Sequence, residues 1–200
     1  MKISKLWFFA IALAMGFLSA MTSCGSSCSK DEDDSTALDT VAPMAQDTTY
    51  ELAIERYLVE TIAPNYAQAE ISIPNVAIIG VDESNTEDIQ VWGDFWVFNY
   101  NVSGDTLKTV SGGNHPGLIH LRKIGKEYEV TSIDEVADGA GNLESAKKIF
   151  GDKFEKFQAT NSDESLREQS RQEDIKEYVQ KSGLKVSMYQ DYGWPPVKLY

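Results

Sequence analysis

The spacing of apolar and polar residues predicts a helix, then a run of strands, then further helices in residues 47–200. Between residues 50 and 62, apolar side chains recur every three or four positions, which is the period of a helix with one core-facing side. Thr48 and Glu51 have the spacing of a capping box, and Pro64 is expected to end the helix. The core-facing positions are Tyr50, Ala53, Ile54, Tyr57, Leu58, Thr61 and Ile62.

Residues 88–102 alternate between two faces, as in a long β-strand. One face carries Trp92, Asp94, Trp96, Phe98 and Tyr100. The other face carries Val91, Gly93, Phe95, Val97 and Asn99. Gly93 inside this strand indicates a bulge or a bend. Shorter runs predict further strands at residues 76–81, 106–112, 118–124 and 128–136.

The C-terminal part is more polar and predicts two helices, at residues 144–150 and 163–182. We expect Ser162 to cap the second helix and Gly183 to end it. Its sparse apolar stripe consists of Leu166, Ile175, Tyr178 and Val179. A short edge strand is expected at residues 186–189, because Pro195 and Pro196 exclude a central strand in the tail.

This order of elements predicts an α+β fold for one domain at residues 47–200. In it, an N-terminal helix packs on a curved antiparallel sheet of four to five strands, and the other helices follow. Over residues 47–136 the order resembles that of NTF2-like and cystatin-like domains. The resemblance implies an apolar pocket between the helix and the concave face of the sheet.

Four residues on one face of the long strand are the candidates for lining such a pocket: Trp92, Asp94, Trp96 and Tyr100. A carboxylate among aromatic rings has a raised pKa and suits proton transfer, so Asp94 is the candidate group for chemistry on a small apolar ligand. The alternative is that this face belongs to the core and that Asp94 turns to solvent at the bulge. The pattern of residues leaves both interpretations open.

The first 23 residues have the layout of a secretory signal. Lys2 and Lys5 precede an uncharged apolar run at residues 6–18, and small and polar residues follow it. The run has 13 residues, whereas a membrane-spanning helix needs about 20. We therefore expect residues 1–23 to be removed as a signal peptide.

Cys24 and Cys28 are the only cysteines in the chain. A structural zinc site needs about four ligands, and a disulfide across so short a loop adds little stability. The segment LSAMTSC resembles the lipobox of bacterial lipoproteins, in which the cysteine receives a diacylglycerol and its new amino group is acylated. The resemblance places the lipid on Cys24, with Cys28 as the rival site.

The residues after the cysteines predict where the protein is held. Residues 24–46 lack apolar periodicity and are expected to form a flexible, lipid-anchored linker. The patch SKDEDD at residues 29–34 resembles a signal that sends lipoproteins of some Gram-negative bacteria to the outer surface, although a solvated linker has a similar composition. The expected location is the cell envelope, with the protein lipid-anchored to the outer membrane.

The chain has a net charge of −13, which limits the kinds of partner that it is expected to bind. This excess of carboxylates argues against binding nucleic acid, which requires lysine and arginine against phosphates. It argues equally against electrostatic binding to an anionic membrane surface. The partner expected from the sequence is the membrane, through the covalent lipid, and the protein or small-molecule partner of the domain is not specified.

No motif in the domain specifies an enzyme, a metal or a cofactor. His115 and His120 lack the spacing of a metal-binding pair, and Asp138, Asn142 and Glu144 lack the full ligand set of a calcium loop. We expect no cofactor and a non-catalytic binding or structural domain. The alternatives are an NTF2-like enzyme that uses Asp94, and an accessory subunit that docks through its edge strand or the tail GWPPV.

Overall fold

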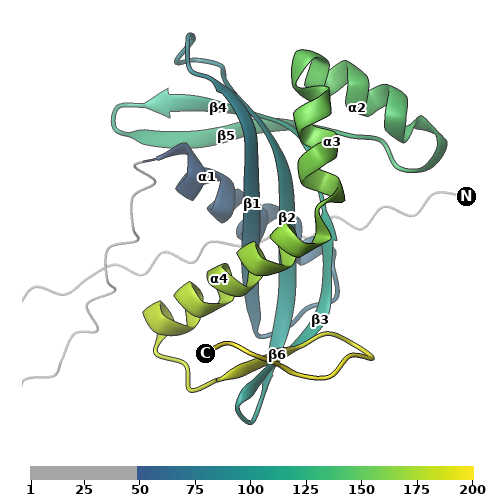
Figure 1. The fold of residues 1–200 in the computed structure, drawn as a ribbon. Coiled ribbons are helices and arrows are strands. Elements are labelled where there is room, and N and C mark those ends of the chain that lie inside the picture. Colours follow the sequence, from purple (N-terminus) through teal and green to yellow (C-terminus); the bar gives the residue numbers. More distant parts are fainter. Residues whose placement is uncertain (1–48) are drawn as a thin grey trace, which may run out of the picture. The chain divides into compact units, whose positions relative to one another are not determined.

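The computed structural model describes residues 49–200, and their fold is α+β, with an open sheet of seven strands and helices on both faces (Figure 1). Helix α1 spans Tyr50–Tyr57 and continues as a π-helical turn at Leu58–Ile62 and a 3₁₀ turn at Ala63–Asn65. Pro64 lies within that last turn, as the sequence predicts for a helix end. The cap is Thr49 and not Thr48, because Thr49 is the extended residue whose hydroxyl accepts a hydrogen bond from the Leu52 amide.

The sheet is organised around β2 (Ile89–Ser103), the long aromatic strand. Strand β1 (Ile71–Asp82) pairs with one edge of β2. On the other edge, β4 (Gly117–Ile124) and then β3 (Thr106–Asn114) pair with successive parts of β2. Strand β5 (Glu127–Glu135) pairs with β4.

The tail of the chain adds two strands that raise the number above the predicted four to five. Strand β6 (Met188–Gln190) pairs in parallel with β3, and β7 (Val197–Lys198) pairs with β6. Strand β1 begins earlier than predicted and includes Pro74, which is compatible with its position at a sheet edge. The irregularity that Gly93 indicated falls opposite it, between Ile78 and Gly80 of β1.

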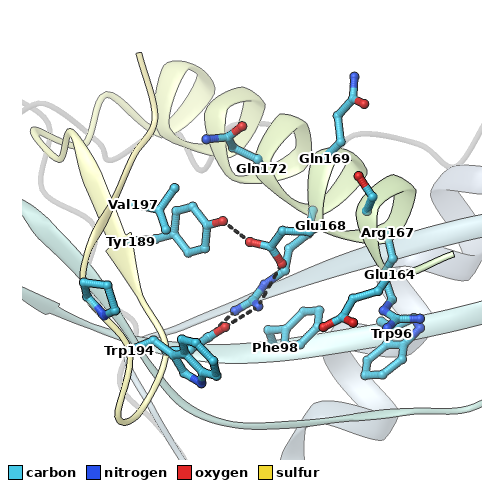
Figure 2. A pocket seen from close by; sticks show the side chains of 14 residues that line it. Trp96, Phe98, Glu164, Arg167, Glu168, Gln169, Gln172, Tyr189, Trp194 and Val197 are labelled. Atoms are coloured by element: carbon cyan, nitrogen blue, oxygen red, sulfur yellow. Dashed lines mark hydrogen bonds and ion pairs between the residues drawn. The ribbon is translucent and has the colours of Figure 1, made fainter.

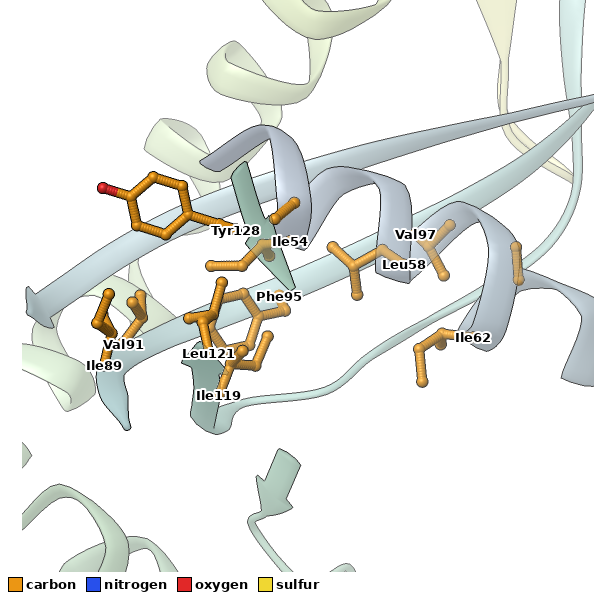
Figure 3. Close-up of a cluster of buried hydrophobic side chains, with 12 residues drawn as sticks. Ile54, Leu58, Ile62, Ile89, Val91, Phe95, Val97, Ile119, Leu121 and Tyr128 are labelled. Atoms are coloured by element: carbon orange, nitrogen blue, oxygen red, sulfur yellow. The ribbon is translucent and has the colours of Figure 1, made fainter. Parts of the chain in front are cut away.

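Helix α1 covers one face of the sheet and forms a core with it (Figure 3). Ile54, Leu58 and Ile62 contact the face of β2 that carries Phe95 and Val97. Ile119 and Leu121 of β4 and Tyr128 of β5 complete this layer. These side chains are at most 8% exposed, and burying each aliphatic one stabilises the fold by about 1.5–3 kcal/mol. The helical stripe predicted from the sequence is therefore confirmed except at Thr61, which is exposed.

Helices α2 (Asn142–Phe150), α3 (Phe154–Ser162) and α4 (Glu164–Ser182) cover the opposite face. The helices predicted at residues 144–150 and 163–182 leave the position of α3 between them without a helix. Only two of its nine residues, Phe154 and Phe157, are buried, so α3 lacks the apolar period that would reveal it. The predicted cap of α4 is also wrong by one residue. Asp163 caps the helix through a hydrogen bond from the Leu166 amide, because its backbone leaves the helical region there.

The apolar stripe predicted for α4 is partly wrong. Leu166 is 53% exposed, whereas Ile175 and Val179 are buried against the sheet. Arg171 takes the buried position next along the stripe, with 6% of its surface exposed. A buried arginine requires polar partners, and these define the region described next.

Candidate ligand-binding groove

An open groove of about 790 Å³ lies between α4 and the β6–β7 tail, with β2 beneath it (Figure 2). This volume is within the range of about 300–1,000 Å³ typical of small-molecule sites. Its main lining residues come from three elements: Trp96 and Phe98 from β2, Glu164, Arg167, Glu168, Arg171 and Gln172 from α4, and Asp191 and Trp194 from the tail.

The base of the groove is a stack of aromatic rings and guanidinium groups. The rings of Trp96 and Phe98 are nearly parallel, with their centres 5.6 Å apart. Arg167 lies 5.0 Å from the centre of the Trp96 ring, and Arg171 lies 3.9 Å from that of Phe98. The two arginines are four residues apart on α4, so they share one side of the helix. Cation–π contacts therefore fix the spacing between α4 and the sheet.

Arg171 is the centre of a buried polar cluster. Its two terminal nitrogens each donate to one oxygen of the Asp191 carboxylate, both at 2.8 Å. Nε donates to the Tyr100 hydroxyl at 2.9 Å, and Nη2 also donates to Thr109 Oγ1 at 2.9 Å. A bidentate guanidinium–carboxylate pair of this kind fixes geometry as well as charge. The cluster therefore holds α4, β2, β3 and the tail in one arrangement.

The pKa shifts in this cluster have local causes. The hydrogen bond from Arg171 lowers the pKa of Asp191. Burial raises the pKa of Tyr100 to about 12, although Arg171 acts in the opposite direction. For Arg171, burial lowers the pKa, but the hydrogen bonds to Asp191 and Tyr100 outweigh it and raise the pKa overall. Arginine and aspartate are thus both charged at neutral pH.

The wall of the groove on the α4 side is a row of planar polar side chains. Glu164, Glu168 and Gln172 recur every four residues, so they follow one line along the helix. Glu168 accepts a hydrogen bond from the Tyr189 hydroxyl. Gln172 donates to the backbone carbonyl of Lys198 at 2.7 Å, which fastens the tail to α4.

The opposite wall is Trp194, which an ordered turn presents to the groove. The Trp194 amide donates to the Asp191 carbonyl at 3.1 Å, and Gly193 has the positive φ of 80° that this turn requires. The Gln190 side chain donates to the Trp194 carbonyl at 2.8 Å. Despite this fixed backbone, the Trp194 side chain is 71% exposed and faces α4 across the groove.

The four residues predicted to line a pocket lie in three separate places. Trp96 lines the groove, and Tyr100 belongs to the Arg171 cluster beneath it. Trp92 lies toward α2, where its indole donates to the Ile149 carbonyl at 2.9 Å and Lys153 lies 4.3 Å from its ring centre. Asp94 is 2% exposed, so it does not turn to solvent, and it is not part of the groove lining.

Asp94 lies in a polar region under the junction of α3 and α4. Within residues 49–200, Asp94 Oδ1, Trp96 Nε1 and Asn114 Oδ1 are buried and make no hydrogen bond. Burial raises the pKa of Asp94, and the neighbouring Trp96, Asn114 and Arg167 act in the opposite direction. Arg167 also donates to the Asn161 carbonyl at 2.9 Å. A buried carboxyl with a raised pKa is therefore present, but it is covered.

The histidines and the possible calcium loop have structural partners. His115 lies between Tyr66 and Glu135, at 2.8 and 3.1 Å, and His120 lies 2.6 Å from Asp88. The segment at Gly139–Gly141 is a 3₁₀ turn that leads into α2. In the part of the chain that the structure describes, no group of three or more histidine, cysteine or acidic side chains is arranged to hold a metal.

Sequence reasoning missed most of the groove. Arg167 and Arg171 carried one usable signal, since they are four residues apart on a helix whose apolar stripe is incomplete. The tail GWPPV gives a weaker sequence signal for Trp194. Cys24 and Cys28 lie outside the described residues. From Thr49 to the end of the chain, no helix has the length and apolarity needed to cross a bilayer.

Comparisons with known proteins identify no relative of this chain. No family model matches the chain, and neither the curated proteins nor the solved structures include a significant match.

Proposed function

We propose that this chain is a lipid-anchored protein of the cell envelope whose folded domain binds a ligand without catalysis, with the groove beside α4 as the binding site. The main support for this proposal is the exposed side chain of Trp194. An aromatic side chain held on a fixed turn, over a groove whose arginines are already engaged, is suited to contact with a partner. We further propose that α1 and strands β1–β5 form a core of the NTF2-like or cystatin-like kind.

The anchoring part of the proposal is supported by the lipobox-like sequence. Growth with an alkyne fatty acid should label the wild-type protein, and Cys24→Ser should abolish the label while Cys28→Ser keeps it. Label that persists in Cys24→Ser and disappears in Cys28→Ser would move the lipid to the rival site. Label that survives both substitutions would refute the lipoprotein assignment.

The binding part is tested by the full chain in detergent, immobilised and exposed to an envelope extract. Trp194→Ala should lose the captured material. Tyr192→Ala is the matched control, because Tyr192 lies in the same turn, is 97% exposed and does not line the groove. Equal capture by wild type and Trp194→Ala would refute the groove as the site. A captured protein complex would favour the accessory-subunit alternative, in which the tail docks to a larger assembly.

A second candidate function is proton transfer by Asp94 on a small apolar ligand. Its support is the burial of Asp94 and the direction of its pKa shift. The reaction would require the α3–α4 junction to uncover the carboxyl, because Asp94 is not part of the groove lining. Asp94→Asn separates the two functions, since it should abolish turnover in the enzymatic case and leave ligand capture intact in the binding case.

A further inference from the structure

We infer that the groove binds a neutral glycan, held with a sugar face against Trp194 and hydroxyl groups against α4. This inference rests on the proposed function, because it names the ligand class of the same site. It follows from the different chemistry of the two walls, from the balance of charge between them and from the exposure of Trp194.

The two walls of the groove match the two sides of a sugar ring. A pyranose has C–H groups on its faces and hydroxyl groups around its edge. Trp194 offers a large apolar surface with one N–H donor, which suits the C–H face. Along α4, Glu164 offers a carboxylate, and Gln172 offers its amide oxygen while its amide nitrogen stays bonded to Lys198; both oxygens can accept from sugar hydroxyl groups.

Charge in the groove does not favour an ionic ligand. The lining contains three carboxylates, Glu164, Glu168 and Asp191, and two guanidiniums, Arg167 and Arg171. Arg171 is bound to Asp191 through two hydrogen bonds, so an anionic ligand would have to displace an internal carboxylate. The groove is thus nearly neutral in a chain of net charge −13. A ligand selected by charge would instead require an unbalanced site.

The groove is also of a suitable size and shape. Its volume of 790 Å³ and its open form admit a short stretch of a longer polymer. The walls are positioned before any ligand binds, because Gln172 holds the tail and Gly193 sets the turn. Preorganisation matters for sugars, since each hydroxyl group must exchange bonds with water for bonds of similar strength.

The test uses the full chain in detergent and an array of neutral oligosaccharides of glucose, mannose, xylose, galactose and N-acetylglucosamine. Wild type should bind at least one of these glycans, and indole fluorescence should titrate with it. Trp194→Ala should weaken that binding by about tenfold or more, and Glu164→Ala should also weaken it. Tyr192→Ala should bind as wild type does.

The outcomes separate this inference from the proposed function. If no neutral glycan binds but envelope material is captured in a manner that depends on Trp194 and is destroyed by protease, the groove is a binding site and the glycan assignment is wrong. If neither glycan nor envelope material depends on Trp194, both are wrong. If a glycan binds equally to wild type and Trp194→Ala, the glycan site is elsewhere and the inference fails.

Discussion

Replacing Arg171 with methionine should destabilise the domain by about 3 kcal/mol. The substitution keeps the volume of the side chain but leaves the Tyr100 hydroxyl, fully buried, without its donor. An unpaired buried hydroxyl costs about 1–3 kcal/mol. Asp191 also loses its partner, but its side chain is 37% exposed, so solvent reduces that cost to about 1–2 kcal/mol.

A double-mutant cycle isolates the pair itself. Asp191→Asn leaves the Arg171 guanidinium, on a side chain that is 7% exposed, without its counter-charge and should cost about 2–3 kcal/mol. The double variant should cost less than the sum of the two by about 1.5 kcal/mol, because the second change removes a group that has already lost its partner.

Urea unfolding, followed by tryptophan fluorescence and circular dichroism, measures these free energies provided that the m-value stays constant. Arg122→Met is the control, because Arg122 and Glu129 form an exposed ion pair, with side chains 45% and 52% exposed, whose loss should cost much less than that of the Arg171 pair. Arg171 and Asp191 do not form a stabilising buried pair if Arg171→Met costs no more than Arg122→Met, or if the coupling is below about 0.5 kcal/mol.

Acid provides a second check on the same pair. Because Arg171 lowers the pKa of Asp191, the folded state binds that proton more weakly than the unfolded state does. The stabilisation is complete above the unfolded pKa of about 4 and is lost as the pH falls through the lower folded value. The difference in stability between wild type and Arg171→Met should therefore narrow in acid.

Three further predictions concern the scaffold. Burial raises the pKa of Asp174 to about 6, so its stability contribution falls as the pH rises from about 4 to about 6. In urea titrations, Asp174→Asn should then stabilise the fold by about 1 kcal/mol near pH 8 but not near pH 4. An equal change in the free energy of unfolding at both pH values would contradict this. A Cβ on Gly113 would lie 1.8 Å from the Tyr66 hydroxyl, so Gly113→Ala should lower the melting temperature. Adding Tyr66→Phe should recover part of that loss, and no recovery would place the strain elsewhere. Asp163→Ala should cost about 1 kcal/mol, whereas Ser162→Ala, at the predicted but incorrect cap, should cost less than half of that.

Periodicity accounts for the parts of the fold that could be predicted from the sequence. The stripe of α1 and the two faces of β2 follow from residues of one type at regular spacing. Helix α3 could not be found in this way, because two phenylalanines in nine residues do not define a period. The cap positions differ by one residue because neighbouring Thr48 and Thr49, or Ser162 and Asp163, have similar capping ability.

The site was harder to predict because its polar contacts join distant segments. The alternation in β2 assigns Asp94 and Trp96 to the correct face of the strand, but the pattern of β2 alone does not indicate which helix covers each face. Arg171 is buried only because Tyr100, 71 positions away, and Asp191, 20 positions away, supply its partners. A single charged residue on a polar helix gives no local sign of such a network.

The parallel pairing of β6 with β3 has a consequence for how the molecule reaches this structure. The contact between Thr109 and Asp191 joins residues 82 positions apart, and closing so long a loop is slow compared with forming the hairpins of β2–β5. We therefore expect the tail, and Trp194 with it, to dock late in folding. A slow phase in the refolding fluorescence would report this step. Until it is complete, a chain can contain its sheet and helices and still lack one wall of its groove. We therefore expect the proposed binding to appear only with this last step of folding.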